Sequence, residues 1–106
     1  MEAIDEIKTS TNLNANSLDL TDGEFDSFIT SKNDFFESYL NKRYDRDEDI
    51  ISAVAVLLTI NYLNKLQFQL EQGLIKRDEY ATFNVNNLLL FDDTIKELLK
   101  QGAVLL

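Results

Sequence analysis

The sequence predicts an all-α fold, a small bundle of about four helices in which a long buried central helix (about 47–72) packs on an amphipathic helix (about 21–43). Three observations lead to this prediction. The 106 residues include no Pro and only three Gly, so few positions force the chain out of a helix. Large apolar side chains recur at intervals of three and four in the first of these segments. The second is apolar nearly all round between residues 50 and 63, which is typical of a helix covered on several sides.

The helix at 21–43 begins with a recognisable cap. Thr21 is followed three residues later by Glu24, the spacing of a capping box in which each side chain bonds a backbone N–H at the helix start. Its apolar positions fall along one stripe, and we expect them to pack in the core rather than to form an aromatic ligand site. The stripe consists of Phe25, Phe28, Ile29, Phe35, Phe36, Tyr39 and Leu40.

The central helix follows a charged link at residues 44–49, where Asp47 or Asp49 is placed to cap it. Its first turn is acidic, as the helix dipole prefers. Beyond Asn64 the apolar residues lie along one side of the helix only. Gly73 then stands where a left-handed residue would end the helix.

Three further segments lie before and after these two helices. Residues 2–8 form a short helix with Ile4 and Ile7 on one face, and residues 9–17, rich in Asn, Ser and Thr, form a loop anchored by Leu13. Residues 74–91 are expected to be a short helix followed by a loop.

A last helix is predicted near the end of the sequence. Asp92 or Asp93 would cap it, and Gly102 would close it. Its apolar positions are Ile95, Leu98 and Leu99. The tail at 103–106 is apolar, which indicates that it needs a partner surface in its own domain or in a neighbour.

Composition limits the function. A chain of this length is expected to be one domain spanning 1–106. The absence of Cys and His removes thiolate nucleophiles, the ordinary zinc sites and the commonest general base, so we expect no enzyme, no cofactor and no metal. The net charge of −9 argues against a surface that binds nucleic acid. The acidic start does not resemble a secretory signal and no long apolar run suggests a membrane span, so we expect a soluble product of a cytoplasm.

Two acidic patterns in the sequence have the composition of functional sites. Asp45, Asp47 and Asp49 alternate like the start of a calcium-binding loop, but Ile50 stands where that loop needs Gly and Val56 where it needs Glu. A solvated, helix-capping link is the better interpretation. The adjacent acidic pairs at 48–49 and 92–93 would point apart at a helix start, so they do not predict acid–base catalysis.

The compact basic cluster of the chain is Lys42, Arg43 and Arg46, which flank Tyr44. Two roles are open: it balances the acidic link and the helix carboxyl end, or it pairs with an acidic face of a neighbouring subunit. We take these residues and the apolar end of the tail as the candidate subunit interface: Lys42, Arg43, Tyr44, Arg46, Val104, Leu105 and Leu106.

Residues 18–62 resemble the head-tail connector (adaptor) proteins of tailed viruses. The resemblance lies in the Leu20-Thr21-Asp22 helix opening, in the run 36–44 (Phe-Glu-Ser-Tyr-Leu-Asn-Lys-Arg-Tyr) and in the following apolar helix with Ile51, Ala53, Ala55, Leu58 and Tyr62. It implies a structural virion protein of the neck that is made in the host cytoplasm. Its subunits would form a homo-oligomeric, twelvefold ring between the portal and the tail or stopper (head-completion) proteins, with DNA passing through the lumen.

A rival interpretation is a small acidic binding inhibitor, such as an immunity protein or an anti-defence mimic of DNA. An inhibitor of this kind should concentrate its carboxylates on one face. In the sequence they are scattered over the whole chain, which favours the adaptor.

Overall fold

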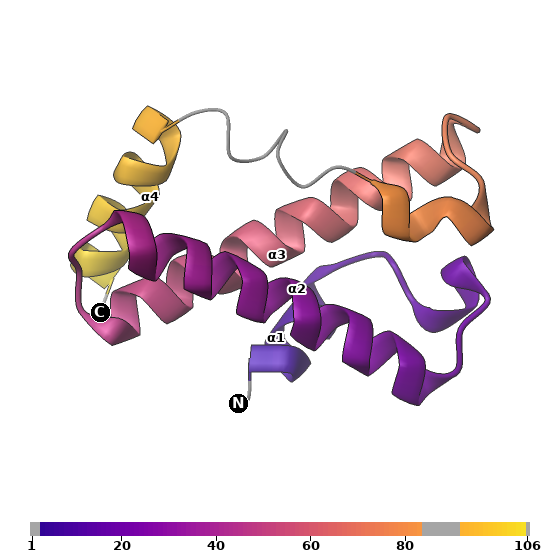
Figure 1. Ribbon diagram of the computed structural model, residues 1–106, viewed down its shortest axis with the longest axis horizontal. Coiled ribbons are helices and arrows are strands. Elements are labelled where there is room, and N and C mark those ends of the chain that lie inside the picture. Colours follow the sequence, from indigo (N-terminus) through magenta and orange to yellow (C-terminus); the bar gives the residue numbers. More distant parts are fainter. Residues whose placement is uncertain (1–2, 84–91, 106) are drawn as a thin grey trace.

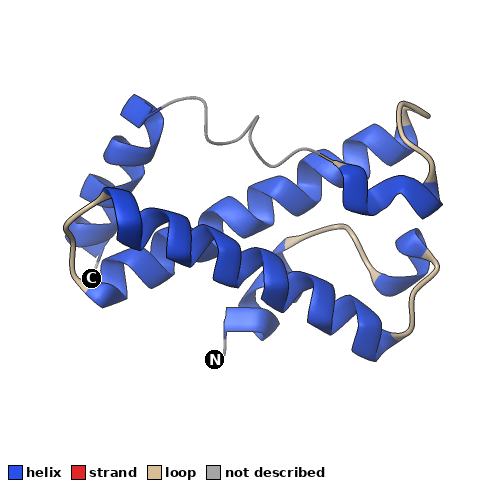
Figure 2. Ribbon diagram, viewed as in Figure 1, coloured by secondary structure: helices blue, strands red, loops and turns tan. Residues whose placement is uncertain are grey.

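The computed structural model describes residues 3–83 and 92–105, and it describes side chains for 3–83 and 93–101. The elements in chain order are α1 (Ala3–Ser10), the 3-10 helix η1 (Ala15–Leu18), α2 (Asp22–Arg43), α3 (Glu48–Glu71), the 3-10 helix η2 (Arg77–Thr82) and α4 (Asp92–Leu105). The described residues contain no strand (Figure 2). The predicted all-α bundle with a long central helix is confirmed.

Helices α2 and α3 form the antiparallel pair on which the other elements pack (Figure 1). The capping box at the start of α2 is present: the Thr21 N–H donates to Glu24 Oε1 at 3.0 Å, and the Glu24 N–H donates to Thr21 Oγ1 at 3.2 Å. The hydrogen bond from the Thr21 N–H to the carboxylate, followed by that of the Thr21 side chain, lowers the pKa of Glu24. The predicted start of this helix is therefore correct.

The core lies between α2 and α3, with contributions from α1, η1 and α4. Phe36, Leu40, Ile51 and Tyr62 are completely buried within it. The buried hydroxyl of Thr59 donates to the carbonyl oxygen of Ala55 at 2.7 Å, so this polar position in the apolar helix carries no unsatisfied donor. The buried apolar residues of the core are Ile7, Leu13, Ala15, Leu18, Phe25, Ile29, Phe36, Leu40, Ile50, Ile51, Val54, Ala55, Val56, Leu58, Tyr62, Leu63, Leu66, Ile95 and Leu99.

The prediction that Phe35 faces the core is wrong, because its side chain is 42% exposed. Phe35 and Phe36 are adjacent, so they lie about 100° apart around the helix axis and only one can point at α3. Phe36 takes the buried position, and the Phe35 ring packs edge-on against it with centroids 5.5 Å apart.

The ends of α3 follow the predicted pattern with one difference. Asp47 is the N-cap residue, but its side chain forms no capping hydrogen bond, so the acidic start contributes through the helix dipole. Gly73 has φ of +70°, the left-handed conformation expected after this helix.

The predicted loop at 9–17 is more ordered than its composition indicated. Helix α1 extends to Ser10, and Asn14 caps η1 by a reciprocal pair of hydrogen bonds with Ser17. Asn and Ser are poor residues for helix interiors because their side chains bond nearby backbone groups, and here those bonds build a short 3-10 turn. Leu13 is buried, as predicted.

The segment after Gly73 forms the 3-10 helix η2, where the sequence indicated a short helix followed by a loop; residues 84–91 of that predicted loop lie outside the described residues. Tyr80 packs edge-on against Phe28 of α2, with ring centroids 5.0 Å apart. The ring of Phe83 lies 5.1 Å from that of Tyr62. These aromatic contacts fix η2 on the α2–α3 pair.

Helix α4 differs from the prediction at both ends. Asp92 and Asp93 lie inside its first turn, and its N-cap position falls outside the described residues. The predicted stop at Gly102 is wrong, since the helix continues to Leu105. A Gly inside a helix costs only about 1 kcal/mol, and the helix-compatible residues at 103–105 continue it.

By length and hydropathy, α3 is the one described helix that passes the criterion for crossing a membrane. Half of its most apolar window is buried inside the protein, as in the central helix of a bundle.

Candidate subunit interface

The basic turn, which we define as Lys42, Arg43, Tyr44 and Arg46, lies where α2 ends and turns into α3. Tyr44 is the C-cap residue of α2, and its N–H donates to the carbonyl oxygen of Leu40 at 2.9 Å. Its side chain is half-buried against the core. The turn is therefore anchored to the helical pair and presents its cations from a defined backbone.

The guanidinium of Arg43 stacks on an aromatic ring. Its central carbon lies 4.6 Å from the ring centroid of Tyr39, one helical turn earlier. This cation–π contact orients the planar group while leaving its N–H edge available, the arrangement that favours bidentate binding of a carboxylate. Arg46 Nη1 donates to the carbonyl oxygen of Asp45 at 2.9 Å.

The cations of the turn are exposed and lack acidic partners within the described chain. Neither Lys42 nor Arg43 nor Arg46 forms an ion pair with a described carboxylate, although the link to α3 carries several acidic residues. By contrast, Lys8 of α1 pairs with Asp26 of α2 at 2.8 Å, and this bond raises the pKa of Lys8. Among the side chains that the structure describes, no carboxylate would thus have to be displaced before these cations pair with an external anion.

The tail lies on α4, at the end of the molecule where α2 meets α3 (Figure 1). Val104 and Leu105 belong to the last turn of this helix, and Leu106 falls outside the described residues. Ile95 and Leu99 are buried, so the helix is packed on the core rather than projecting from it. The two candidate patches of the sequence therefore occupy one end of the fold.

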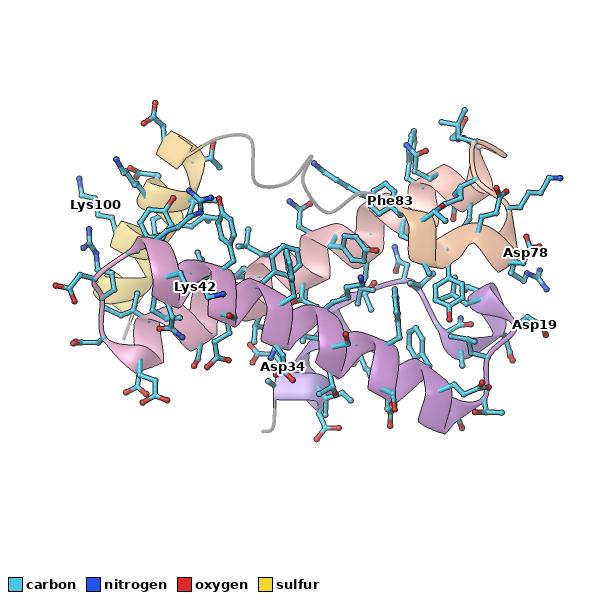
Figure 3. The ribbon with its side chains drawn as sticks, in the orientation of Figure 1. Asp19, Asp34, Lys42, Asp78, Phe83 and Lys100 are labelled. Atoms are coloured by element: carbon cyan, nitrogen blue, oxygen red, sulfur yellow. The ribbon has the colours of Figure 1, made fainter. Side chains whose placement is uncertain are left out.

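Two further cations were missed because they are distant in sequence. Lys96 and Lys100 are exposed on α4, one helical turn apart, and Figure 3 shows Lys100 and Lys42 toward the same end of the molecule. The two basic segments are separated by the forty-nine residues between Arg46 and Lys96. The packing of α4 on α3 brings them to one end, which no local pattern predicts.

The outward face of α2 is polar and mainly acidic, in contrast to the basic turn at its end. Two shallow hollows of about 510 and 480 Å³ run along it, lined by hydroxyl, amide and carboxylate groups. Lys42, at the end of the second hollow, is the one basic side chain among the residues that line the two hollows. The lining residues are Asp26, Ser27, Thr30, Ser31, Asp34, Glu37, Ser38, Asn41 and Lys42.

Lys32 occupies the flank of α2 that faces Tyr62 of α3. Its Nζ lies 5.5 Å from the ring centroids of both Phe28 and Tyr62, and burial lowers the pKa of this amine. This cation is held by two aromatic faces, and it stabilises the contact between α2 and α3.

No group of three or more metal-ligating side chains gathers among the described residues, and Asp45, Asp47 and Asp49 are all exposed. Comparison of the chain with protein-family models, with curated proteins and with solved structures finds no match.

Proposed function

We propose that the protein is a structural virion component of a tailed virus, an adaptor subunit that forms a ring between the portal and the tail or stopper proteins. The proposal rests on the resemblance of residues 18–62 and on one observation: Arg43, stacked on Tyr39, offers a guanidinium that pairs with no described carboxylate, beside exposed Lys42 and Arg46. Arg and aromatic residues are the types that dominate binding energy at protein interfaces.

A ring needs two different complementary patches on each subunit, because a head-to-tail contact repeats until it closes. The basic turn is one patch of this pair. The hollow nearer the start of α2, lined by Asp26 and Asp34, is the complementary patch of the next subunit, since the hollow that follows it includes Lys42 of the basic turn itself. Twelve copies with a charge of −9 each would also give the lumen a wall that DNA does not adhere to. Such a subunit needs no catalytic group, cofactor or metal.

The distribution of carboxylates favours the adaptor over the acidic inhibitor. In Figure 3, Asp19 and Asp78 lie at one end of the fold and Asp34 lies near its middle, so these carboxylates do not form one continuous row. A mimic of DNA should gather its charges in one outward row, since its target recognises a continuous phosphate backbone.

The proposal is tested by reconstitution with the portal protein of the virus that encodes the chain, followed by electron microscopy. The wild-type protein is expected to add a ring to the portal, and R43E is expected to reduce its occupancy at least tenfold. R77E, which makes the same substitution at an exposed residue of η2, serves as the matched control. Absence of the wild-type protein from the portal, together with stoichiometric inhibition of a nuclease, would favour the inhibitor.

A further inference from the structure

The segment after α3 folds back on the helical pair without completely burying a side chain. We define the η2 strap as residues 75–83, which follow the end of α3 and contain η2 (orange in Figure 1). Its best covered side chains, Ile75, Tyr80 and Phe83, are half-buried, and its other residues are exposed. By contrast, the shorter 3-10 helix η1 has two buried residues among its four. The strap therefore adds little apolar burial to the fold.

Two ring contacts and one hydrogen bond hold the strap on the α2–α3 pair. The ring of Tyr80 lies 5.0 Å from that of Phe28, and the ring of Phe83 lies 5.1 Å from that of Tyr62. The Tyr62 hydroxyl donates to the carbonyl oxygen of Phe83 at 3.4 Å, which is long for a bond from a hydroxyl group. All three contacts involve only the last four residues of the strap. They must offset the entropy lost by ordering the whole segment.

The first residues of the strap stand beside a hollow rather than against packed side chains. This hollow of about 360 Å³ is lined by Ile75 and Arg77 of the strap, by Ser17 of η1 and by the end of α3. Gln67 of α3 also lines it, and Gln67 Oε1 is buried with no hydrogen-bond partner among the described residues. A buried acceptor without a partner costs free energy that water recovers once it gains access. Undocking of the strap would therefore relieve this acceptor.

Gly73 provides a hinge at the start of the strap. It has φ of +70°, and it is exposed. The Gly73 N–H donates to the carbonyl oxygen of Leu70 at 3.2 Å, and the Leu74 N–H donates to that of Gln69 at 3.0 Å. These bonds complete the end of α3 before the strap begins. The strap can therefore move by rotation at the hinge without unwinding α3.

We propose that the η2 strap undocks as a unit from the α2–α3 pair while the rest of the fold stays intact. Segments with few buried contacts open at a lower free energy than the whole protein. The other elements keep their own anchors, such as Ile7 of α1 and Leu99 of α4, which are completely buried. Opening uncovers the rings of Phe28 and Tyr62, from which Lys32 Nζ lies 5.5 Å. The docked strap thus controls access to this aromatic face.

Native-state proteolysis with trypsin measures the opening. Lys76 and Arg77 are exposed in the strap and Lys65 is exposed on α3, so one digest reports on both elements. Cleavage follows the population in which the chain around the site is locally unfolded. Cleavage after Lys76 or Arg77 is expected to be about tenfold faster than cleavage after Lys65, or more, and nearly independent of urea below the global transition. Cleavage after Lys65 should rise with urea as global unfolding does.

Y80A tests whether cleavage in the strap requires release of the ring contact with Phe28. This variant is expected to raise the ratio of strap cleavage to Lys65 cleavage about fivefold. F68A is the matched control, because Phe68 is a 55% exposed ring that takes part in neither ring contact of the strap, and it should leave the ratio unchanged. The ratio is internal to each protein, so a general loss of stability does not imitate the result.

Covalent closure of the strap gives the converse test. The double variant F28C/Y80C places one thiol on α2 and one on the strap, and the chain contains no native Cys to interfere. Joining the two thiols with a short, reducible crosslinker is expected to slow cleavage after Lys76 and Arg77 about tenfold. Reduction of the crosslink should restore the rate in the same protein.

Three results would overturn the proposal: strap cleavage with the urea dependence of cleavage after Lys65, equal cleavage ratios for Y80A and F68A, or equally fast cleavage of the crosslinked and reduced proteins. The first would show that the strap opens only when the whole fold does. The other two would show that the chain is cleaved without release of Tyr80 from Phe28. None of these measurements uses the portal or virus particles, so failure of the strap leaves the adaptor proposal standing, and the reverse also holds.

Discussion

The hydroxyl of Tyr62 donates a hydrogen bond of 3.4 Å to the backbone carbonyl oxygen of Phe83, and the two rings lie 5.1 Å apart. This relationship joins the middle of α3 to the end of η2, across twenty-one residues of sequence. Tyr62 is completely buried, and its ring also contacts Phe36 and Phe28 of α2. The Tyr62 side chain thus links α3 to α2 and to the end of η2, the segment for which the sequence predicted least.

Alkaline pH should weaken the fold through Tyr62. Burial raises its pKa from 10.0 to about 12, so the unfolded chain releases this proton before the folded protein does. The stability contributed by the neutral phenol is complete below pH 10 and is lost as the pH rises toward 12. Urea unfolding at pH 8, 10 and 11 measures the effect.

Y62F is the control for this pH dependence, since it keeps the ring and removes the ionising group. The midpoint of the wild-type protein is expected to fall more steeply above pH 10 than that of Y62F. Equal slopes for the two proteins would show that other groups cause the alkaline loss.

The adjacent residues Phe35 and Phe36 should respond very differently to truncation. Phe36 is completely buried, so F36A leaves a cavity and is expected to cost about 3–5 kcal/mol of unfolding free energy. Phe35 is 42% exposed, so F35A should cost about 1 kcal/mol or less, chiefly through the lost ring contact. Urea denaturation measures the unfolding free energy of both variants, and equal losses of this free energy would contradict the assignment of Phe36 to the core.

This pair also shows what the sequence is able to predict. The three-and-four spacing identified α2, its cap at Thr21 and the buried character of α3 because these features depend on residues close in the chain. Spacing alone could not choose between two adjacent Phe residues at the margin of the stripe. That choice depends on where α3 crosses α2, which is a property of the folded pair.

The remaining errors have similar causes. The Asn- and Ser-rich stretch forms the 3-10 helix η1 because Asn14 and Ser17 bond each other's backbone groups. Composition alone predicts a loop there, since it does not show which side chains bond the backbone. Helix α4 continued past Gly102, whose local signal was too weak to end it. The candidate interface gained Lys96 and Lys100 through tertiary packing, and that grouping has no signal in the local sequence.

The two glycines near helix ends should respond to alanine with opposite signs. Gly73 has φ of +70°, a conformation that strains any residue with a Cβ, so G73A is expected to destabilise the protein by about 1–2 kcal/mol. A Cβ at Gly23 meets no atom within 4 Å, so G23A in the first turn of α2 should raise the free energy of unfolding of the protein by about 0.4–1 kcal/mol. Thermal melts followed by circular dichroism measure both shifts, and a stabilising G73A would contradict the left-handed end of α3.

Removal of Val104, Leu105 and Leu106 should impair assembly without unfolding the domain. These residues follow the buried anchors Ile95 and Leu99 of α4, so the packed part of the helix stays intact. The expected result is an unchanged thermal midpoint within about 2 °C, with loss of ring formation on the portal. Equal assembly by the shortened protein would remove the tail from the proposed interface.

The central claim is that this chain is a subunit of the virion neck. Quantitative mass spectrometry of purified virus particles, counting this chain against the major capsid protein, tests it most directly. We expect about a dozen copies per particle, as the twelvefold symmetry implied by the resemblance to connector subunits requires. Absence of the chain from purified particles would contradict the adaptor function and leave the acidic inhibitor as the function to test.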